Sequence, residues 1–225
     1  MKYDVEEMFG VRDKVVVVTG GCGGIGQGLA EGLAALGAIV ALLDMNQQKL
    51  DSIAAGIAQK TGATVQGYAA DIIDEAGVEA VFETINADLG PVYGLINCAG
   101  ISYVAPLSQM PMDRWAAVMD VNVKGTVICC KVAGKYMAQN HAGRVVNISS
   151  LAATHGKPGY TAYTPSKAAI NGLTFTLAAE WARLGINVNS VSPVMVVTDI
   201  NRHQVEEDPD YLPRINSTIT QGRIC

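Results

Sequence analysis

Six short apolar runs alternate in this chain with segments of helical pattern, and this alternation restricts the fold more than any other feature of the sequence. Runs rich in β-branched residues, separated by segments of helix length, are typical of parallel strands joined by crossover helices. The sequence therefore predicts an α/β fold, a doubly wound parallel sheet with helices on both faces in three layers. The predicted strands are KVVVVT at 14–19, AIVALL at 38–43, ATVQGYAA at 63–70, VYGLIN at 92–97, GRVVNIS at 143–149 and GINVNSVS at 185–192.

Two of the intervening segments carry the spacing of a helix with one buried face. No repeat, low-complexity tract or linker divides the chain, so we expect residues 1–225 to form a single domain. In sheets of this kind ligands bind at the carboxyl ends of the strands, so the residues that follow each run are the candidates for function. The apolar faces consist of Leu50, Ile53, Ala54 and Ile57 in the first segment and Ile170, Leu173, Leu177 and Trp181 in the second.

The composition argues against several classes of partner. Of the 225 residues 49% are hydrophobic and 16% charged, and the net charge is -5 with Lys and Arg scattered along the chain. We expect no nucleic-acid partner and no binding to an anionic membrane, because both need clustered basic residues. No apolar stretch approaches the ~20 residues that span a bilayer, so we expect no membrane segment.

The cysteines and histidines form no metal-binding pattern. The five cysteines are odd in number and lack metal-ligand spacing, and the three histidines are dispersed, so we expect no catalytic metal. The polar start MKYDVEEMFG lacks the apolar run of a signal peptide, and a reducing cytoplasm suits such cysteines best. The residues concerned are Cys22, Cys98, Cys129, Cys130 and Cys225, with His141, His155 and His203.

The loop after the first strand predicts a nucleotide site. TGGCGGIG at 19–26 leads into a predicted helix, and its glycines let the backbone approach a pyrophosphate, which the helix amides and positive end stabilise. Asp44 ends the second strand, eighteen residues after Gly26, where its carboxylate can accept hydrogen bonds from the adenosine ribose hydroxyls. Asp44 also repels a 2′-phosphate, and the loop contains no Arg or Lys, so we expect NAD rather than NADP. Asp44 could instead cap the helix starting at Asn46, although Asn46 can serve as that cap itself.

The segment YTAYTPSK contains two tyrosines, of which one is the candidate acid or base. A four-residue step on a helix places Tyr163 beside Lys167, whereas Tyr160 has only Thr164 at that step. A nearby ammonium favours the phenolate, so Lys167 should lower the pKa of Tyr163 from about 10 toward neutral pH. Pro165 is tolerated only in the first turn of a helix, so the helix should begin close to Tyr163. Tyr160 then lies in the preceding loop, where it lines a substrate pocket or packs.

These motifs follow one another over nearly the whole chain, and in this order the sequence resembles the short-chain dehydrogenase/reductase family, with a likeness to its NAD-dependent polyol and sugar dehydrogenases. TGGCGGIG matches the family's T-G-x-x-x-G-x-G, and NCAG at 97–100 resembles its N-x-A-G turn. The resemblance implies a Rossmann-like fold, NAD as cofactor, and Asn122, Ser150, Tyr163 and Lys167 as the catalytic set. The cofactor-binding residues that it implies are Thr19, Gly20, Cys22, Gly24, Ile25, Gly26, Asp44, Asp71, Ile72, Asn97, Ala99, Gly100, Tyr163, Lys167, Pro193, Val196 and Thr198.

The resemblance also implies a mechanism, in which hydride passes between the nicotinamide and a secondary alcohol or ketone. Tyr163 would be the acid or base on the substrate oxygen, and Lys167 would lower its pKa and hold the nicotinamide ribose. Ser150 would hydrogen-bond the substrate oxygen, and Asn122 would support Lys167 through a proton-relay water. Asp71 would contact the adenine amino group.

Several of these residues have plainer alternatives. Asn122 could be only a polar residue of a helix. Ser150 could be an ordinary turn serine, although its spacing before the tyrosine is the one that the family favours over that of Ser149. Asp71 competes for its role with Asp74, which is well placed to cap the next helix and so leaves Asp71 for the ligand.

The sequence departs from the family pattern at two places. In PVMVVT, at 193–198, Val194 stands where the family has glycine, so this turn must avoid a positive φ. Pro193, Val196 and Thr198 can still reach the nicotinamide carboxamide. The chain stops at TITQGRIC, about thirty residues short of the usual family length, so we expect a seventh strand to be missing from an incomplete or truncated chain.

The segments expected around the substrate contain several polar residues. We expect Ser102, Tyr103, the segment 152–160 and a lid-like stretch at 199–212 to form the pocket, and the polar lining favours a polyol, sugar or sugar acid as substrate. The alternatives are a 3-oxoacyl-thioester reductase, which Asp44 disfavours, and a dinucleotide-binding protein without turnover. Two predicted long helices, around 113–140 and 163–184, could form a homotetramer interface. The polar pocket residues are His155, Tyr160, Asn201, Arg202 and His203.

Overall fold

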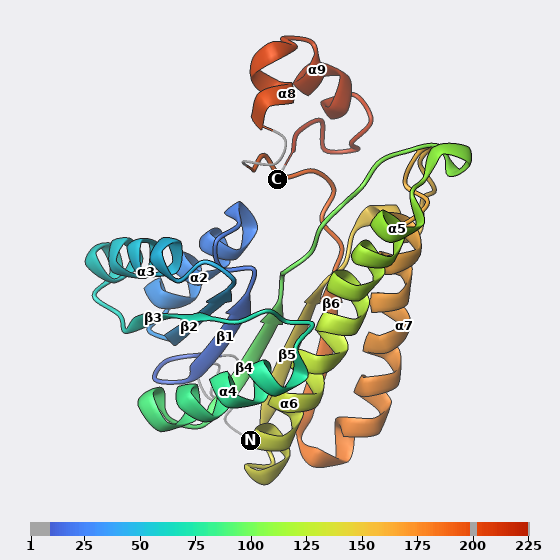
Figure 1. The fold of residues 1–225 in the computed structure, drawn as a ribbon. Helices are drawn as coiled ribbons and strands as arrows, with labels where there is room; N and C mark the ends of the chain where they lie inside the picture. Colours follow the sequence, from blue (N-terminus) through green and yellow to red (C-terminus); the bar gives the residue numbers. More distant parts are fainter. Residues whose placement is uncertain (1–9, 199–201, 225) are drawn as a thin grey trace, which may run out of the picture.

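The computed structural model of the protein describes residues 10–198 and 202–224 (Figure 1). Six strands form one sheet in the order β3-β2-β1-β4-β5-β6, and all neighbouring strands are parallel. This is the predicted Rossmann-like arrangement, in which the strand order reverses direction between β1 and β4. The strands are β1 (Val15–Thr19), β2 (Ile39–Asp44), β3 (Val65–Ala69), β4 (Val92–Asn97), β5 (Gly143–Ile148) and β6 (Ile186–Val191).

Helices cover both faces of the sheet and give the predicted three layers (Figure 1). Side chains alternate between the faces of a strand, and β1 shows this directly. Val15 and Val17 pack into the core beneath α4, α6 and α7, whereas Val16 and Val18 pack beneath α2 and α3. The helices are α2 (Gly24–Ala35), α3 (Gln47–Thr61), α4 (Glu75–Leu89), α5 (Met112–Met119), α6 (Thr126–Gln139), α7 (Tyr163–Trp181), α8 (Arg202–Glu207) and α9 (Tyr211–Asn216).

The predicted single helix at 113–140 is wrong in one respect. A π-helical segment, η2 (Asp120–Gly125), separates α5 from α6. Within this segment the side chain of Asn122 makes two hydrogen bonds to Ile101, in the loop that follows β4. Such segments are frequent at functional sites, so the irregularity draws attention to Asn122.

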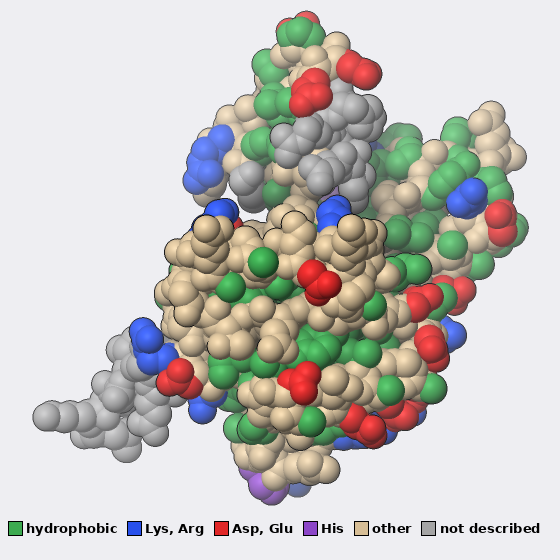
Figure 2. Space-filling view, turned by 60° about the vertical axis from the view of Figure 1, so that its left-hand side comes forward, with side chains coloured by type: hydrophobic (Ala, Val, Ile, Leu, Met, Phe, Trp, Pro, Cys, Tyr) green, Lys and Arg blue, Asp and Glu red, His purple; other side chains and the backbone are tan. Residues whose placement is uncertain are grey.

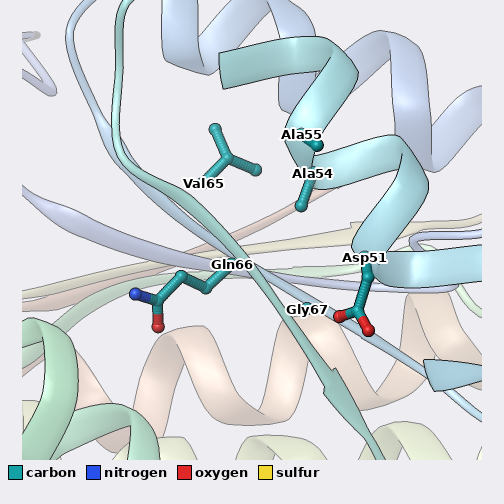
Figure 3. A pocket seen from close by; sticks show the side chains of 6 residues that line it. All are labelled: Asp51, Ala54, Ala55, Val65, Gln66 and Gly67. Atoms are coloured by element: carbon teal, nitrogen blue, oxygen red, sulfur yellow. The ribbon is translucent and has the colours of Figure 1, made fainter. Parts of the chain in front are cut away.

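At the β3 edge of the sheet, one glutamine occupies hydrogen-bonding positions that a further strand would use. The Gln47 amide donates to Gly67 O (2.9 Å) and accepts from Ala69 N (2.8 Å), so it pairs with β3 as a neighbouring strand would. The same amide also donates to the Asp51 carboxylate (2.6 Å). Figure 3 shows the hollow beside this contact, between α3 and β3, lined by Asp51, Ala54, Ala55, Val65, Gln66 and Gly67.

The two short helices α8 and α9 lie beyond the carboxyl ends of the strands (Figure 1). Figure 2 shows the molecule from the side of α2 and α3, where acidic and basic side chains are scattered and no continuous basic surface is seen on this face. None of the helices in the described part of the chain is long and apolar enough to cross a membrane.

Candidate active site

The four residues assigned to catalysis come from three places along the chain near the carboxyl ends of β4 and β5. Asn122 belongs to the π segment, Ser150 follows β5, and Tyr163 and Lys167 lie in the first turns of α7. The helix begins at Tyr163, as the position of Pro165 predicted. A proline is tolerated in the first turn because the backbone N–H that it lacks would have no partner within the helix.

Tyr163 and Lys167 are neighbours beneath the surface. The Lys167 ammonium lies 5.7 Å from the centre of the Tyr163 ring, and its side chain is buried. Burial lowers the pKa of Lys167 to about 8. The expected lowering of the Tyr163 pKa is wrong for this structure: burial raises the pKa of the phenol, and the nearby Ser150 hydroxyl only partly opposes this effect.

The two serines after β5 have different surroundings. The Ser149 hydroxyl is buried and donates to the carbonyl oxygen of Lys167 (3.1 Å). This hydrogen bond links the end of β5 to α7. The Ser150 hydroxyl is near enough to the Tyr163 phenol to lower its pKa, and it accepts from Ala152 N (3.1 Å). The structure therefore brings Ser150, and not Ser149, to the phenol.

Asn122 connects the loop after β4 to the start of α7. Its side-chain oxygen accepts from Ile101 N (2.8 Å), and its amide donates to Ile101 O (3.0 Å) and to Ser166 Oγ (2.9 Å). Ser166 is fully buried and donates to the carbonyl oxygen of Tyr163 (2.7 Å). Ser166 was absent from the sequence prediction, and only its place beside Lys167 in YTAYTPSK could have indicated it.

Tyr160 packs against the candidate acid or base. The Tyr160 and Tyr163 rings meet edge to face with their centres 5.7 Å apart. Of the two roles expected for Tyr160, lining a pocket or packing, this contact shows packing. His155 is exposed, with Nδ1 2.9 Å from Thr154 Oγ1. Asn201 lies outside the described residues, as do the side chains of Arg202 and His203.

The glycine loop fits the close approach of a phosphate group. Gly20 has φ +71°, and a Cβ there would lie 2.8 Å from the backbone of Ala99. At Gly26 a Cβ would lie 2.2 Å from Gly20 O, so neither position accepts a side chain. Gly23 precedes α2, and the N-terminus of this helix has no side-chain cap and no acidic residue in its first turn. These features suit the pyrophosphate of a dinucleotide, so the residues present fit the predicted cofactor.

Asp44 stands at the end of β2 and faces this loop. Its carboxylate accepts from Cys22 N (2.9 Å) and from Met45 N (2.7 Å), and Gln27 donates to Cys22 O (2.9 Å). Asn46 caps α3 by accepting from the backbone amide three residues later (3.0 Å). The alternative role of Asp44 as the cap of α3 is therefore wrong, and its carboxylate, which has further lone pairs, is held in place by the loop.

The polar residues at the ends of β3 and β4 differ in their hydrogen-bond partners. The Asp71 carboxylate accepts from Ile73 N (3.1 Å), while Asp74 stands at the N-terminus of α4 without a side-chain hydrogen bond to it. Asn97, the last residue of β4, is buried and donates to Asn147 (2.8 Å), so its side chain joins β4 to β5. Thr19 Oγ1 accepts from Cys98 N (3.1 Å) and fixes the turn that follows Asn97.

The segment after β6 approaches the glycine loop. A Cβ at Gly24 would lie 3.1 Å from Thr198 Cγ2, so Thr198 lies over the N-terminus of α2, close to where the pyrophosphate is expected. Pro193 O accepts from Leu151 N (3.1 Å) and ties the segment to the loop that carries Ser150. Among the described non-glycine residues only Asp13 and His141 have a positive φ, so Val194 avoids it as predicted.

The other predicted cofactor residues lie in several different segments. Ile25 and Gly26 belong to the first turn of α2, and Ile72 is buried against the π segment, where a Cβ at Gly125 would lie 2.5 Å from its side chain. A Cβ at Gly100 would lie 3.2 Å from Asn122 Oδ1 and 3.5 Å from Lys167 Nζ, so this glycine leaves room beside both groups. Val196 lies in the segment between β6 and α8. No group of three potential metal-binding side chains occurs among the described residues.

The sequence matches the short chain dehydrogenase family over residues 14–209. It is 34% identical over 201 residues to D-threitol dehydrogenase of Mycolicibacterium smegmatis, covering 89% of this chain and 76% of that protein. The structure resembles NAD⁺-bound xylitol dehydrogenase with a TM-score of 0.89 and 32% identity, covering 95% and 87% of the two chains. It also resembles a gluconate 5-dehydrogenase from Burkholderia cenocepacia in complex with NADP and tartrate, with a TM-score of 0.89, 30% identity and coverage of 95% and 83%. Together with the geometry of the site, these matches show that the chain belongs to the short-chain dehydrogenase family.

Proposed function

We propose that this protein is an NAD(H)-dependent oxidoreductase that interconverts a secondary alcohol and a ketone on a polyol, sugar or sugar acid. The observation that carries the proposal is the position of Tyr163, which begins α7 and lies beside the Ser150 hydroxyl and buried Lys167. A phenol with these neighbours suits proton exchange with a hydroxyl group that is losing or gaining hydride.

Each side chain of the set has a role in this reaction. Tyr163 takes the hydroxyl proton of the alcohol or returns it to the ketone, and Ser150 holds the substrate oxygen at the phenol. Lys167 stabilises the phenolate as it forms and would hold the nicotinamide ribose when the cofactor is bound. Asn122 holds the loop after β4 and the start of α7 in register, and so positions Tyr163. The nicotinamide, when bound, accepts or supplies the hydride.

Asp44 supports NAD over NADP. Its carboxylate is fixed by the Cys22 and Met45 amides, and a fixed negative charge repels a 2′-phosphate while it accepts hydrogen bonds from ribose hydroxyls. The related structures include complexes with NAD⁺ and with NADP, so this preference rests on Asp44 itself. We expect the predicted residues of the glycine loop and of the segment after β6 to hold the rest of the dinucleotide.

The names of the relatives support the substrate class. Threitol and xylitol are polyols and gluconate is a sugar acid, and the dehydrogenase named for each compound is at least 30% identical to this chain.

We further propose a homotetramer that pairs α6 and α7 between copies, where Phe175 is 72% and Val127 40% exposed. A cytoplasmic location agrees with the free thiols of the four described cysteines.

The test is a turnover assay with purified protein, NAD⁺ or NADP⁺, and a panel of polyols, sugars and sugar acids, followed by NADH or NADPH absorbance. We expect turnover on one group of substrates with NAD⁺ preferred. NADPH oxidation with a 3-oxoacyl thioester instead would identify the alternative reductase. Tight NADH binding, with no turnover of any substrate class, would support a dinucleotide-binding protein that does not catalyse the reaction.

A further inference from the structure

A tight turn holds one lysine at the edge of the candidate active site. Tyr160 N donates to Lys157 O (3.1 Å), Pro158 is the second residue of the turn, and Gly159, its third, has φ +83°. This is a type II turn with proline and glycine at the positions that they favour. Because proline fixes φ and the third position needs a positive φ, the turn sets where Lys157 lies relative to Tyr160.

The turn is also anchored on both sides. Ala105 N donates to Gly159 O (3.0 Å), and Thr164 N donates to Tyr160 O (2.9 Å), so the loop after β4 and the first turn of α7 both hold it. Tyr160 is therefore fixed beside Tyr163, with which it makes the edge-to-face contact. The backbone from which Lys157 projects therefore keeps a defined position relative to the start of α7.

Lys157 places a positive charge at this position. Its ammonium lies over the Tyr160 ring, 5.0 Å from the ring centre. Lys157 forms no ion pair with the described carboxylates, whereas the exposed lysines Lys60 and Lys131 each pair with a glutamate. Arg114, which lies over the Tyr103 ring on the neighbouring loop, has Asp113 at 4.0 Å. The positive charge of Lys157 is therefore available to a ligand.

We propose that Lys157 binds the carboxylate of a sugar acid, and that aldonates rather than alditols are the preferred substrates. This inference rests on the proposed function. The oxidised carbon lies at Tyr163, the carbon chain passes the Tyr160 ring, and the carboxylate meets the ammonium of Lys157. A single ammonium matches the single charge of a carboxylate, and alditols carry no charge to use it.

The test compares aldonates with alditols of the same carbon skeleton: D-gluconate with D-glucitol, D-xylonate with xylitol, and D-threonate with D-threitol. In the wild-type protein we expect at least one aldonate to have a KM about two- to fivefold below that of its alditol, as an exposed ion pair contributes. Lys157→Met should remove this advantage by raising the aldonate KM, with kcat and the alditol kinetics nearly unchanged. Added salt should weaken the aldonate advantage, because an exposed ion pair is screened.

A matched control is available at the opposite end of the sheet. Lys14 also lies over a tyrosine ring, that of Tyr93, at 5.3 Å, and it precedes β1, whose carboxyl end faces the site. Lys14→Met makes the same change in net charge and removes the same kind of contact, so it should leave the aldonate advantage intact. An equal loss in both variants would overturn the proposal, as would an unchanged advantage in Lys157→Met. Tighter binding of an alditol phosphate than of the aldonate would overturn the assignment of a carboxylate.

Calorimetry separates this inference from the proposed function. The aldonate is titrated into Tyr163→Phe loaded with NAD⁺, with and without Lys157→Met. The aldonate could bind in a way that depends on Lys157 while the wild-type protein turns over no substrate. This result would support the carboxylate site and contradict the proposed oxidoreductase. Turnover of alditols without any preference for aldonates would overturn the carboxylate site alone. Absence of both binding and turnover would overturn both.

Discussion

The ammonium of Lys167 lies 5.7 Å from the centre of the Tyr163 ring and donates a 2.8 Å hydrogen bond to the carbonyl oxygen of Ile148, the last residue of β5. The position of the cation is thus set by the sheet as well as by the helix. Burial lowers the pKa of Lys167 to about 8 and raises the pKa of Tyr163, so in this structure both groups are shifted toward their neutral forms.

Tyr163→Phe keeps the aromatic ring and removes the proton. We expect kcat to fall by roughly 10²–10⁴-fold, the usual contribution of an acid or base, while NADH binding measured by fluorescence is unchanged. Tyr160→Phe is the matched control, because it keeps the edge-to-face contact and should retain most of the turnover. Wild-type turnover in Tyr163→Phe would remove this residue from the mechanism.

Lys167 makes stability depend on pH. Its pKa is about 8 in the folded chain and near 10.5 when exposed, so between these values the unfolded chain binds a proton that the folded chain does not. The contribution of Lys167 to the free energy of unfolding should therefore rise with pH, by about 2 kcal/mol between roughly pH 8 and 9.5. It is the difference between the wild type and Lys167→Met, because the buried thiols Cys98, Cys129 and Cys130, whose pKa values burial raises, contribute a fall over the same range in both proteins. Denaturant titrations would measure this, and Lys167→Met should lack that part of the rise. Parallel pH curves for the two proteins would contradict the buried, shifted ammonium.

Asp44→Asn removes the negative charge at the end of β2 and keeps a side-chain acceptor for the Cys22 or Met45 amide. The ratio of kcat/KM for NADP⁺ to that for NAD⁺ should rise by about tenfold or more, because repulsion of the 2′-phosphate is lost. A ratio compares two cofactors on one protein, so a general loss of stability does not change it. The same ratio in the wild type and the variant would show that Asp44 does not select the cofactor.

Two glycines of α2 should respond in opposite ways to alanine. At Gly26 a Cβ would lie 2.2 Å from Gly20 O, so Gly26→Ala should lower the free energy of unfolding by roughly 3 kcal/mol and weaken NAD⁺ binding. At Gly28, in the same helix, a Cβ would meet nothing within 4 Å. Gly28→Ala should raise stability by about 0.5–1 kcal/mol, because alanine loses less backbone freedom on folding. Denaturant midpoints and calorimetric NAD⁺ titrations check both, and similar effects at the two positions would contradict the packing described.

The strands were predictable because parallel strands buried on both faces consist of nearly continuous apolar residues. Five of the six strands lie within the run that predicted them, and β2 extends by one residue, to Asp44. The start of α7 was predictable for a local reason as well, since Pro165 restricts it.

The features that sequence reasoning missed depend on contacts between distant parts of the chain. The π segment contains Asn122, whose hydrogen bonds to Ile101 no local pattern records. Ser166 meets Asn122 across 44 positions of sequence. The raised pKa of Tyr163 has the same origin, because spacing reveals the neighbouring ammonium but not the extent of burial.

The contact of Gln47 with β3 also bears on how the protein behaves at high concentration. An exposed sheet edge offers a row of amides and carbonyls on which another polypeptide can add a strand, and this is a common first step of aggregation. Gln47 supplies the complementary amide to Gly67 and Ala69 and so competes with an incoming strand for both groups. A side chain at the N-terminus of α3 thus occupies two of the backbone groups through which another chain would join the sheet.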